Sequence, residues 1–215
     1  MRAMSAVVKR LLASNKISFI ITVLVVLCAT SSGDVVLSNG NYTWLFAVLS
    51  PFFFVFYDFT KFMYLGASKK DYYFGCLIGY GVLAFCISLV NTVIHLLIDP
   101  AYSGKTVINM MDVCKWTENG IIVAGLQQML FLLLVMVFLH VLLSIQAHWY
   151  GWLTDAVLVA IICIFTPIEP LRSVLSGFFQ MIMFNSNAVL HICICLVLSA
   201  ALSIGGLVVL KRKTL

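Results

Sequence analysis

Long apolar segments separated by short polar ones constrain this chain more than any other feature of its sequence. A helix needs about 20 apolar residues to cross the roughly 30 Å hydrocarbon core of a bilayer. Of the 215 residues, 63% are hydrophobic and 10% are charged, whereas soluble domains have about 45–50% and about 25%. A water-soluble fold could not cover its surface with so few polar side chains. We therefore predict an integral membrane protein.

We expect an all-α fold with six transmembrane helices in one membrane domain. The spans are predicted at about residues 17–36, 42–65, 73–98, 121–145, 152–167 and 188–210. Residues 1–16 are predicted to form an amphipathic helix on the membrane surface, so the chain divides into 1–16 and 17–215. A cleaved signal sequence is the alternative for the first apolar run, which is however longer than the usual apolar core of such signals. The sequence leaves open whether the half-polar segment 168–187 re-enters the membrane.

The distribution of Lys and Arg predicts how these spans are oriented. With the N-terminus in the cytoplasm, the inner segments hold ten basic residues: Arg2, Lys9, Arg10, Lys16, Lys61, Lys69, Lys70, Lys211, Arg212 and Lys213. The outer segments hold three, which are Lys105, Lys115 and Arg172. This bias follows the positive-inside rule. We therefore expect both termini in the cytoplasm, with the chain in the plasma membrane of a bacterium.

Several function classes are excluded by what the sequence lacks. The charged residues are too few and too scattered to form a phosphate-binding stripe, so we expect no nucleic-acid partner. A G-x-x-x-x-G-K-[ST] loop is absent, so the chain is not expected to hydrolyse ATP itself. The sequence also lacks H-E-x-x-H and the usual catalytic constellations. We therefore expect neither an enzyme nor a cofactor or metal site.

The predicted inner loop between the second and third spans carries the most informative residues. Gly66 can end a helix, and Ser68 and Asp71 have the S-x-x-D spacing that caps the next one. This pattern predicts a short helix at the cytoplasmic surface, tilted relative to the spans on either side. The alternative is an ordinary charged turn that only sets the orientation of the chain.

The segment Gly66-x-Ser68-Lys69-Lys70-Asp71-Tyr72 resembles the coupling helix of permease subunits of type-2 ABC exporters. The basic N-terminal helix, the six spans and the segment 168–187 also resemble that family. The resemblance implies that the chain pairs with a second copy or a paralogue and docks a cytoplasmic ABC ATPase, which binds ATP and Mg²⁺. The implied ATPase contacts are Gly66, Ala67, Ser68, Lys69, Lys70, Asp71, Tyr72, Tyr73 and Phe74. Export is the direction implied by this resemblance alone.

The predicted second span is rich in aromatic residues, with eleven between Tyr42 and Tyr64. Pro51 is expected to kink this helix and to free a backbone carbonyl. In the family that the chain resembles, the second and fifth spans line the translocation path. The candidate path residues are Pro51, Phe52, Phe53, Phe56, Tyr57, Asp58 and Asp155. An apolar wall of this kind favours a hydrophobic or amphipathic substrate, first of all a peptide. The alternative is that the aromatic residues face lipid and pack against neighbouring helices.

Two other classes of function remain open. One is a channel-like or accessory membrane protein that works without an ATPase. The other is an intramembrane enzyme, for which Asp58 and Asp155 are the only pair of carboxylates predicted at a similar depth. In every case membrane lipids are expected to surround the chain.

Overall fold

The protein is mostly helical in the computed structural model, which describes residues 7–11, 13, 15–28, 34–102, 104–146 and 148–212. The α-helices are α2 (Lys16–Cys28), α3 (Asn39–Tyr42), α4 (Trp44–Phe53), α5 (Phe59–Tyr64), α6 (Lys69–Leu97), α7 (Met110–Val113), α8 (Ile121–Ile145), α9 (Trp149–Phe165), α10 (Glu169–Ile182) and α11 (Ala188–Arg212). A π-helical segment, η1 (Phe54–Asp58), joins α4 to α5, and η2 (Asp99–Ala101) and η3 (Thr117–Asn119) are 3₁₀ turns. Strands β1 (Val35–Leu37) and β2 (Thr106–Ile108) pair in parallel.

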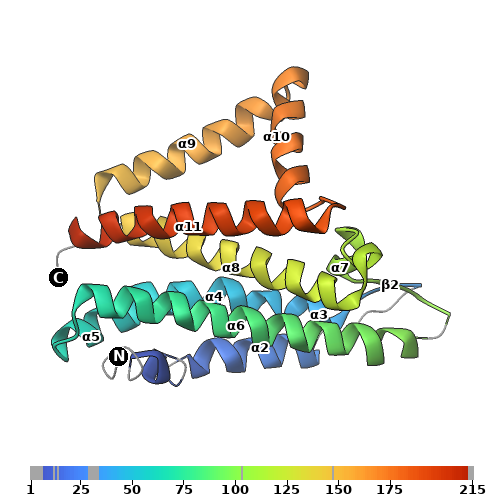
Figure 1. Ribbon diagram of the computed structural model, residues 1–215, viewed down its shortest axis with the longest axis horizontal. Coiled ribbons are helices and arrows are strands. Elements are labelled where there is room, and N and C mark those ends of the chain that lie inside the picture. The colour runs from blue at the N-terminus through green and yellow to red at the C-terminus, as the bar shows by residue number, and fades with distance from the viewer. Residues whose placement is uncertain are drawn as a thin grey trace.

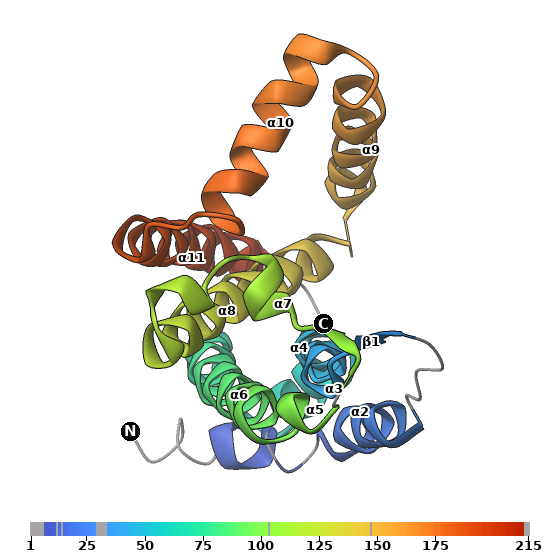
Figure 2. The same cartoon turned by 90° about the vertical axis from the view of Figure 1, so that its right-hand side faces the viewer.

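Five of these helices run along the long axis of the molecule, namely α2, α4, α6, α8 and α11 (Figure 1). α8 packs against α4, α6 and α11, so it lies at the centre of the bundle. α9 and α10 project from one side of this bundle, as the end-on view shows (Figure 2). The turn between α5 and α6 lies at one end, and the β1–β2 pair and α7 lie at the other (Figure 1).

Among the described residues, four helical segments are long and apolar enough to cross a membrane. They are Asn39–Tyr64, Lys69–Ala101, Ile121–Ile145 and Ala188–Leu210. The chain bends by 119° between α9 and α10, so this pair forms either a broken fifth span or a re-entrant loop. Two of the predicted spans, 121–145 and 188–210, agree closely with α8 and α11. The structure therefore supports four to five membrane-spanning segments, compared with the six that the sequence predicts.

The predicted first span, residues 17–36, differs from the structure at its C-terminal end. The helix α2 has 13 residues, which is about 20 Å and shorter than the hydrocarbon core. Val35 and Val36 lie in β1, where Val36 pairs with Val107 of β2. These β-branched residues can extend the helix or enter a strand, and pairing with a distant segment decides in favour of the strand.

The described part of the predicted amphipathic N-terminal helix packs against the bundle. Val7 and Leu11 are buried, whereas Lys9 and Arg10 are exposed. A Cβ atom on Gly75 of α6 would lie 2.6 Å from Val7 Cγ1, so the glycine allows the two segments to approach closely. The apolar face of this segment is thus covered at least in part by the protein itself. The remaining residues of the predicted helix, 1–6, 12 and 14, lie outside the described residues.

Packing between α11 and its neighbours requires a residue without a side chain at position 206. A Cβ atom on Gly206 would lie 2.2 Å from the Tyr73 hydroxyl oxygen and 3.0 Å from Val141 Cγ2. The adjacent Gly205 is exposed and has no other atom within 4 Å of such a position. The two glycines therefore form a matched pair for testing how closely α11 approaches α6 and α8.

We expect Gly206→Ala to lower the free energy of unfolding by about 1–3 kcal/mol, because a methyl group has no space there. Gly205→Ala is the control, and it should leave stability unchanged or raise it by up to about 1 kcal/mol because alanine favours a helix. Thermal unfolding of both variants in detergent measures the difference. Equal stability of the two variants would contradict this packing of α11.

Candidate functional site

The turn between α5 and α6 is built as the sequence predicts. Gly66 has φ of +78°, a left-handed conformation that suits glycine and ends α5. Ser68 caps α6, because its hydroxyl oxygen accepts a hydrogen bond from the Asp71 backbone N–H at 3.0 Å. The same hydroxyl donates to Asp71 Oδ2 at 2.8 Å. These bonds fix the shape of the turn at the end of the bundle, where partners in solution could reach it.

The prediction of a separate, tilted helix at this position is wrong. α6 begins at Lys69 and continues without a break for 29 residues, to Leu97. No glycine or proline between Lys69 and Phe74 interrupts the helix, and the cap at Ser68 therefore starts the span itself. A force on this turn would act directly on the end of a membrane-spanning helix.

Burial divides the predicted ATPase contacts into two groups. Gly66, Ser68, Lys70 and Phe74 are exposed, and the neighbouring Tyr64 and Leu65 are 82% and 60% exposed. Ala67, Lys69 and Asp71 are partly buried. Tyr72 and Tyr73 are 1% and 0% exposed, so their side chains face the interior. We therefore revise the predicted surface by removing these two tyrosines and adding Tyr64 and Leu65.

The two buried tyrosines connect the start of α6 to two other helices. Tyr72 donates a hydrogen bond to the backbone carbonyl of Phe54, the first residue of η1. Tyr73 donates to the carbonyl of Ser203 in α11 at 2.9 Å. Each bond satisfies a hydroxyl group that would otherwise be buried without a partner. The capped turn is thus attached to the apolar segment that precedes it, Asn39–Tyr64, and to the last one, Ala188–Leu210.

The candidate path residues do not share one environment. Pro51 is buried inside α4, and the irregularity in this segment lies beyond it, in the π-helical turn η1. Four aromatic residues form one cluster, with ring centroids 4.8 Å apart for Phe52 and Phe56 and 5.6 Å apart for Phe53 and Tyr57. Three of them, Phe52, Phe56 and Tyr57, are exposed and face outward from the bundle.

The two candidate carboxylates have different neighbours. Asp58 is 4% exposed and interacts electrostatically with Tyr72 and Cys76 inside the bundle. Asp155 Oδ2 accepts a hydrogen bond of 2.7 Å from Gln146 Nε2 near the junction of α8 and α9. These surroundings provide each carboxylate with its own partners and do not join the two into one site.

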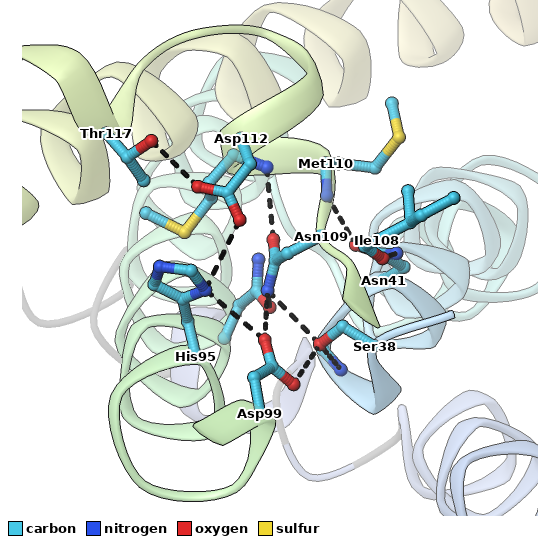
Figure 3. A network of polar contacts seen from close by, with 12 residues as sticks. Ser38, Asn41, His95, Asp99, Ile108, Asn109, Met110, Asp112 and Thr117 are labelled. Atoms are coloured by element: carbon cyan, nitrogen blue, oxygen red, sulfur yellow. Dashed lines mark hydrogen bonds and ion pairs between the residues drawn. The ribbon is translucent and has the colours of Figure 1, made fainter. Parts of the chain in front are cut away.

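Sequence reasoning missed a polar cluster at the opposite end of the bundle, shown in Figure 3. Asp99 is buried at its centre. Ser38 Oγ donates to Asp99 Oδ1 at 2.8 Å, and Asn109 Nδ2 donates to Asp99 Oδ2 at 3.0 Å. His95 Nδ1 lies 3.2 Å from Asp99 Oδ2 and 3.8 Å from Asp112 Oδ2. The only local signal for this cluster is the i, i+4 spacing of His95 and Asp99.

This polar cluster joins segments that are far apart in the sequence. Ser38 caps α3, Asn109 caps α7, and Asp99 follows the end of α6. Asn41 continues the connection, because its Nδ2 donates to the Ile108 carbonyl at 2.8 Å and its Oδ1 accepts from the Met110 N–H at 2.9 Å. The cluster therefore fastens three helix ends to one buried carboxylate.

Cys114 lies beside this end of the bundle in a small apolar cluster with Met111, Trp116 and Ala124. Burial raises the pKa of the Cys114 thiol to about 12, so the thiol stays protonated at neutral pH. Within the described ranges, no group of three or more His, Cys, Asp or Glu side chains is arranged to hold a metal ion.

Comparisons with protein-family models, with curated proteins and with solved structures found no match for this chain.

Replacing Asp99 should be far more costly than replacing its exposed neighbour Asp112. Asp99→Ala removes the acceptor of the buried Ser38 hydroxyl and one acceptor of Asn109 Nδ2, which keeps its contact with Ser38 Oγ. We expect this loss to lower the free energy of unfolding by about 2–3 kcal/mol. Asp112 is 46% exposed, and Asp112→Ala should cost about 1 kcal/mol or less. Thermal unfolding of the two variants in detergent compares them. A similar decrease in the free energy of unfolding for both variants would mean that the cluster does not depend on Asp99.

Proposed function

We propose that this chain is the membrane-embedded permease subunit of an ATP-driven exporter, and that a cytoplasmic ABC ATPase docks on the turn between α5 and α6. The observation that carries the proposal is the construction of this turn. It exposes Lys70 beside Tyr64 and Leu65, while Tyr72 and Tyr73 attach the same turn to η1 and α11. The turn thus offers an exposed surface to a partner and is itself hydrogen-bonded to two of the apolar segments.

Force on the turn would pass into the bundle along two hydrogen-bonded connections. α6 is continuous from the turn to Leu97, so a push at Lys70 displaces the whole helix. The Tyr72 bond takes the displacement to η1, whose wider π-helical turn is a place where a span can change its packing. The Tyr73 bond takes it to α11. In this mechanism the chain moves as packed helices that shift against each other.

The remaining parts of the proposal come from the resemblance to type-2 ABC exporters. Six spans would place both termini in the cytoplasm of a bacterial cell, with the α9–α10 pair as the fifth. α2 would be the first, and it would cross a locally thinned bilayer because its 13 residues are shorter than the usual hydrocarbon core. ATP and Mg²⁺ would bind to the ATPase, and a second copy or a paralogue of this chain would complete the path. The exposed cluster around Phe52, Phe56 and Tyr57 favours a hydrophobic or amphipathic substrate such as a peptide.

Reversing the charge of the turn should separate the ATPase from the membrane subunit. For Lys69→Glu combined with Lys70→Glu, we expect at least a tenfold loss of ATPase copurification from solubilised membranes. The amount of inserted chain should not change, because Lys70 is exposed at the end of the bundle and contributes little to folding.

The matched control reverses Lys105 and Lys115, which are exposed at the opposite end of the bundle. Lys105→Glu combined with Lys115→Glu changes the net charge by the same amount and should leave copurification intact. If both double variants bind the ATPase equally well, or lose it equally, the turn is not the docking site.

A further inference from the structure

An apolar cavity of about 240 Å³ lies between α2, the start of α4 and α6. Its mouth is formed by exposed side chains of two helices, Phe19 and Val23 of α2 and Cys86 and Val90 of α6. Its floor is formed by buried side chains, namely Thr22, Thr43, Ile87 and Ile94. α2 packs chiefly on α3 and α4, so the cavity fills the space between α2 and α6.

The cavity contains no polar group that is available to form a hydrogen bond with a ligand. Its two hydroxyl groups are already used, because Thr22 Oγ1 donates to the Ser18 carbonyl at 2.8 Å and Thr43 Oγ1 donates to the Gly40 carbonyl at 2.6 Å. The other lining residues are apolar apart from the thiol of Cys86. The volume is below the range of about 300–1,000 Å³ that is usual for pockets of drug-sized ligands. An alkyl chain fits both the chemistry and the size.

The residues along α2 lead from this cavity to a positive charge. Phe19, Val23 and Val26 line the cavity, and Lys16 precedes Phe19 by three residues, so that all four share one face of the helix. Lys16 is exposed, and no ion pair involves it among the described residues. The segment from Met1 to Gly33 contains four basic residues and no Asp or Glu, so a negatively charged group would meet no repulsion there.

We propose that this cavity is a binding site for an anionic phospholipid, with one acyl chain between α2 and α6 and the headgroup phosphate at Lys16. The site does not rest on the proposed export function, since it needs only that the helices lie in a bilayer. The 13-residue α2 is too short to span the hydrocarbon core by itself. A bound acyl chain would fill the gap on its open side and hold it against the bundle.

The test measures lipid retention by the full chain, purified in detergent and stripped of lipid. Dioleoyl phosphatidylglycerol and dioleoyl phosphatidylcholine are added separately, and bound lipid is counted by native mass spectrometry. These probes share their acyl chains and differ in net charge. We expect the anionic lipid to be retained at least fivefold better. Lys16→Gln should remove this preference while retaining the binding of either lipid through its acyl chain.

Two tryptophan variants on α6 test the cavity itself. Val90→Trp places a large side chain in the mouth and should reduce retention of the anionic lipid at least fivefold. Val93 is similarly exposed on α6 but does not line the cavity, so Val93→Trp should bind as the unchanged protein does. Equal effects of the two variants, or equal retention of the two lipids by the unchanged protein, would overturn the proposal.

A measurement on the folded protein covers the case in which Val90→Trp fails to fold. Cys28, Cys163 and Cys193 are the other exposed cysteines in the described parts of the chain, and replacing them with serine leaves Cys86 as the accessible thiol. Alkylating Cys86 with a bulky maleimide should then abolish retention of phosphatidylglycerol. Undiminished retention after complete alkylation would contradict an acyl-chain site at this position.

Discussion

The hydrogen bond from the Tyr72 hydroxyl to the Phe54 carbonyl is the contact on which the rest of this arrangement depends. The π-helical turn η1 departs from the regular helical ladder in the middle of an apolar segment. In hydrocarbon each unsatisfied backbone group costs several kcal/mol, so such a turn needs bonding partners from within the protein. The Phe54 carbonyl accepts a hydrogen bond from the backbone N–H of Phe59 within the segment, and Tyr72, in the first turn of α6, provides a second donor to it. The irregular part of one span is therefore attached to the exposed turn that starts the next.

The two ends of the bundle are organised by different chemistry. At one end a capped turn carries exposed Lys70, and buried tyrosines connect the turn to η1 and α11. At the other end a buried carboxylate, Asp99, collects donors from three helix ends. Between them the helices pack through apolar side chains and a few buried polar contacts, such as the 2.7 Å hydrogen bond between Tyr80 and His140. The open space beside α2 is the exception. Both ends of the bundle are therefore held by hydrogen bonds between segments that are far apart in the sequence.

Features set by neighbouring residues were predictable from the sequence, and features set by distant partners were not. The Ser68 cap and the ends of α8 follow from local spacing and from one unbroken apolar run. Strand β1 was missed because Val36 extends only in response to Val107. The interior positions of Tyr72 and Tyr73 were missed for a similar reason, since their acceptors lie in η1 and α11. The polar cluster joins Ser38 to Asn109, which are 71 residues apart, so the spacing of His95 and Asp99 alone could not predict it.

The most direct test of the proposed coupling removes the two tyrosine hydroxyls and keeps the exposed surface of the turn. Tyr72→Phe combined with Tyr73→Phe leaves Lys70 in place, so the partner ATPase should bind with unchanged affinity. We expect the stimulation of ATP hydrolysis by the reconstituted chain to fall at least threefold, because the loss of each hydrogen bond weakens the connection by about 1 kcal/mol. Undiminished stimulation with unchanged binding would contradict the claim that these tyrosines transmit motion from the turn to the spans.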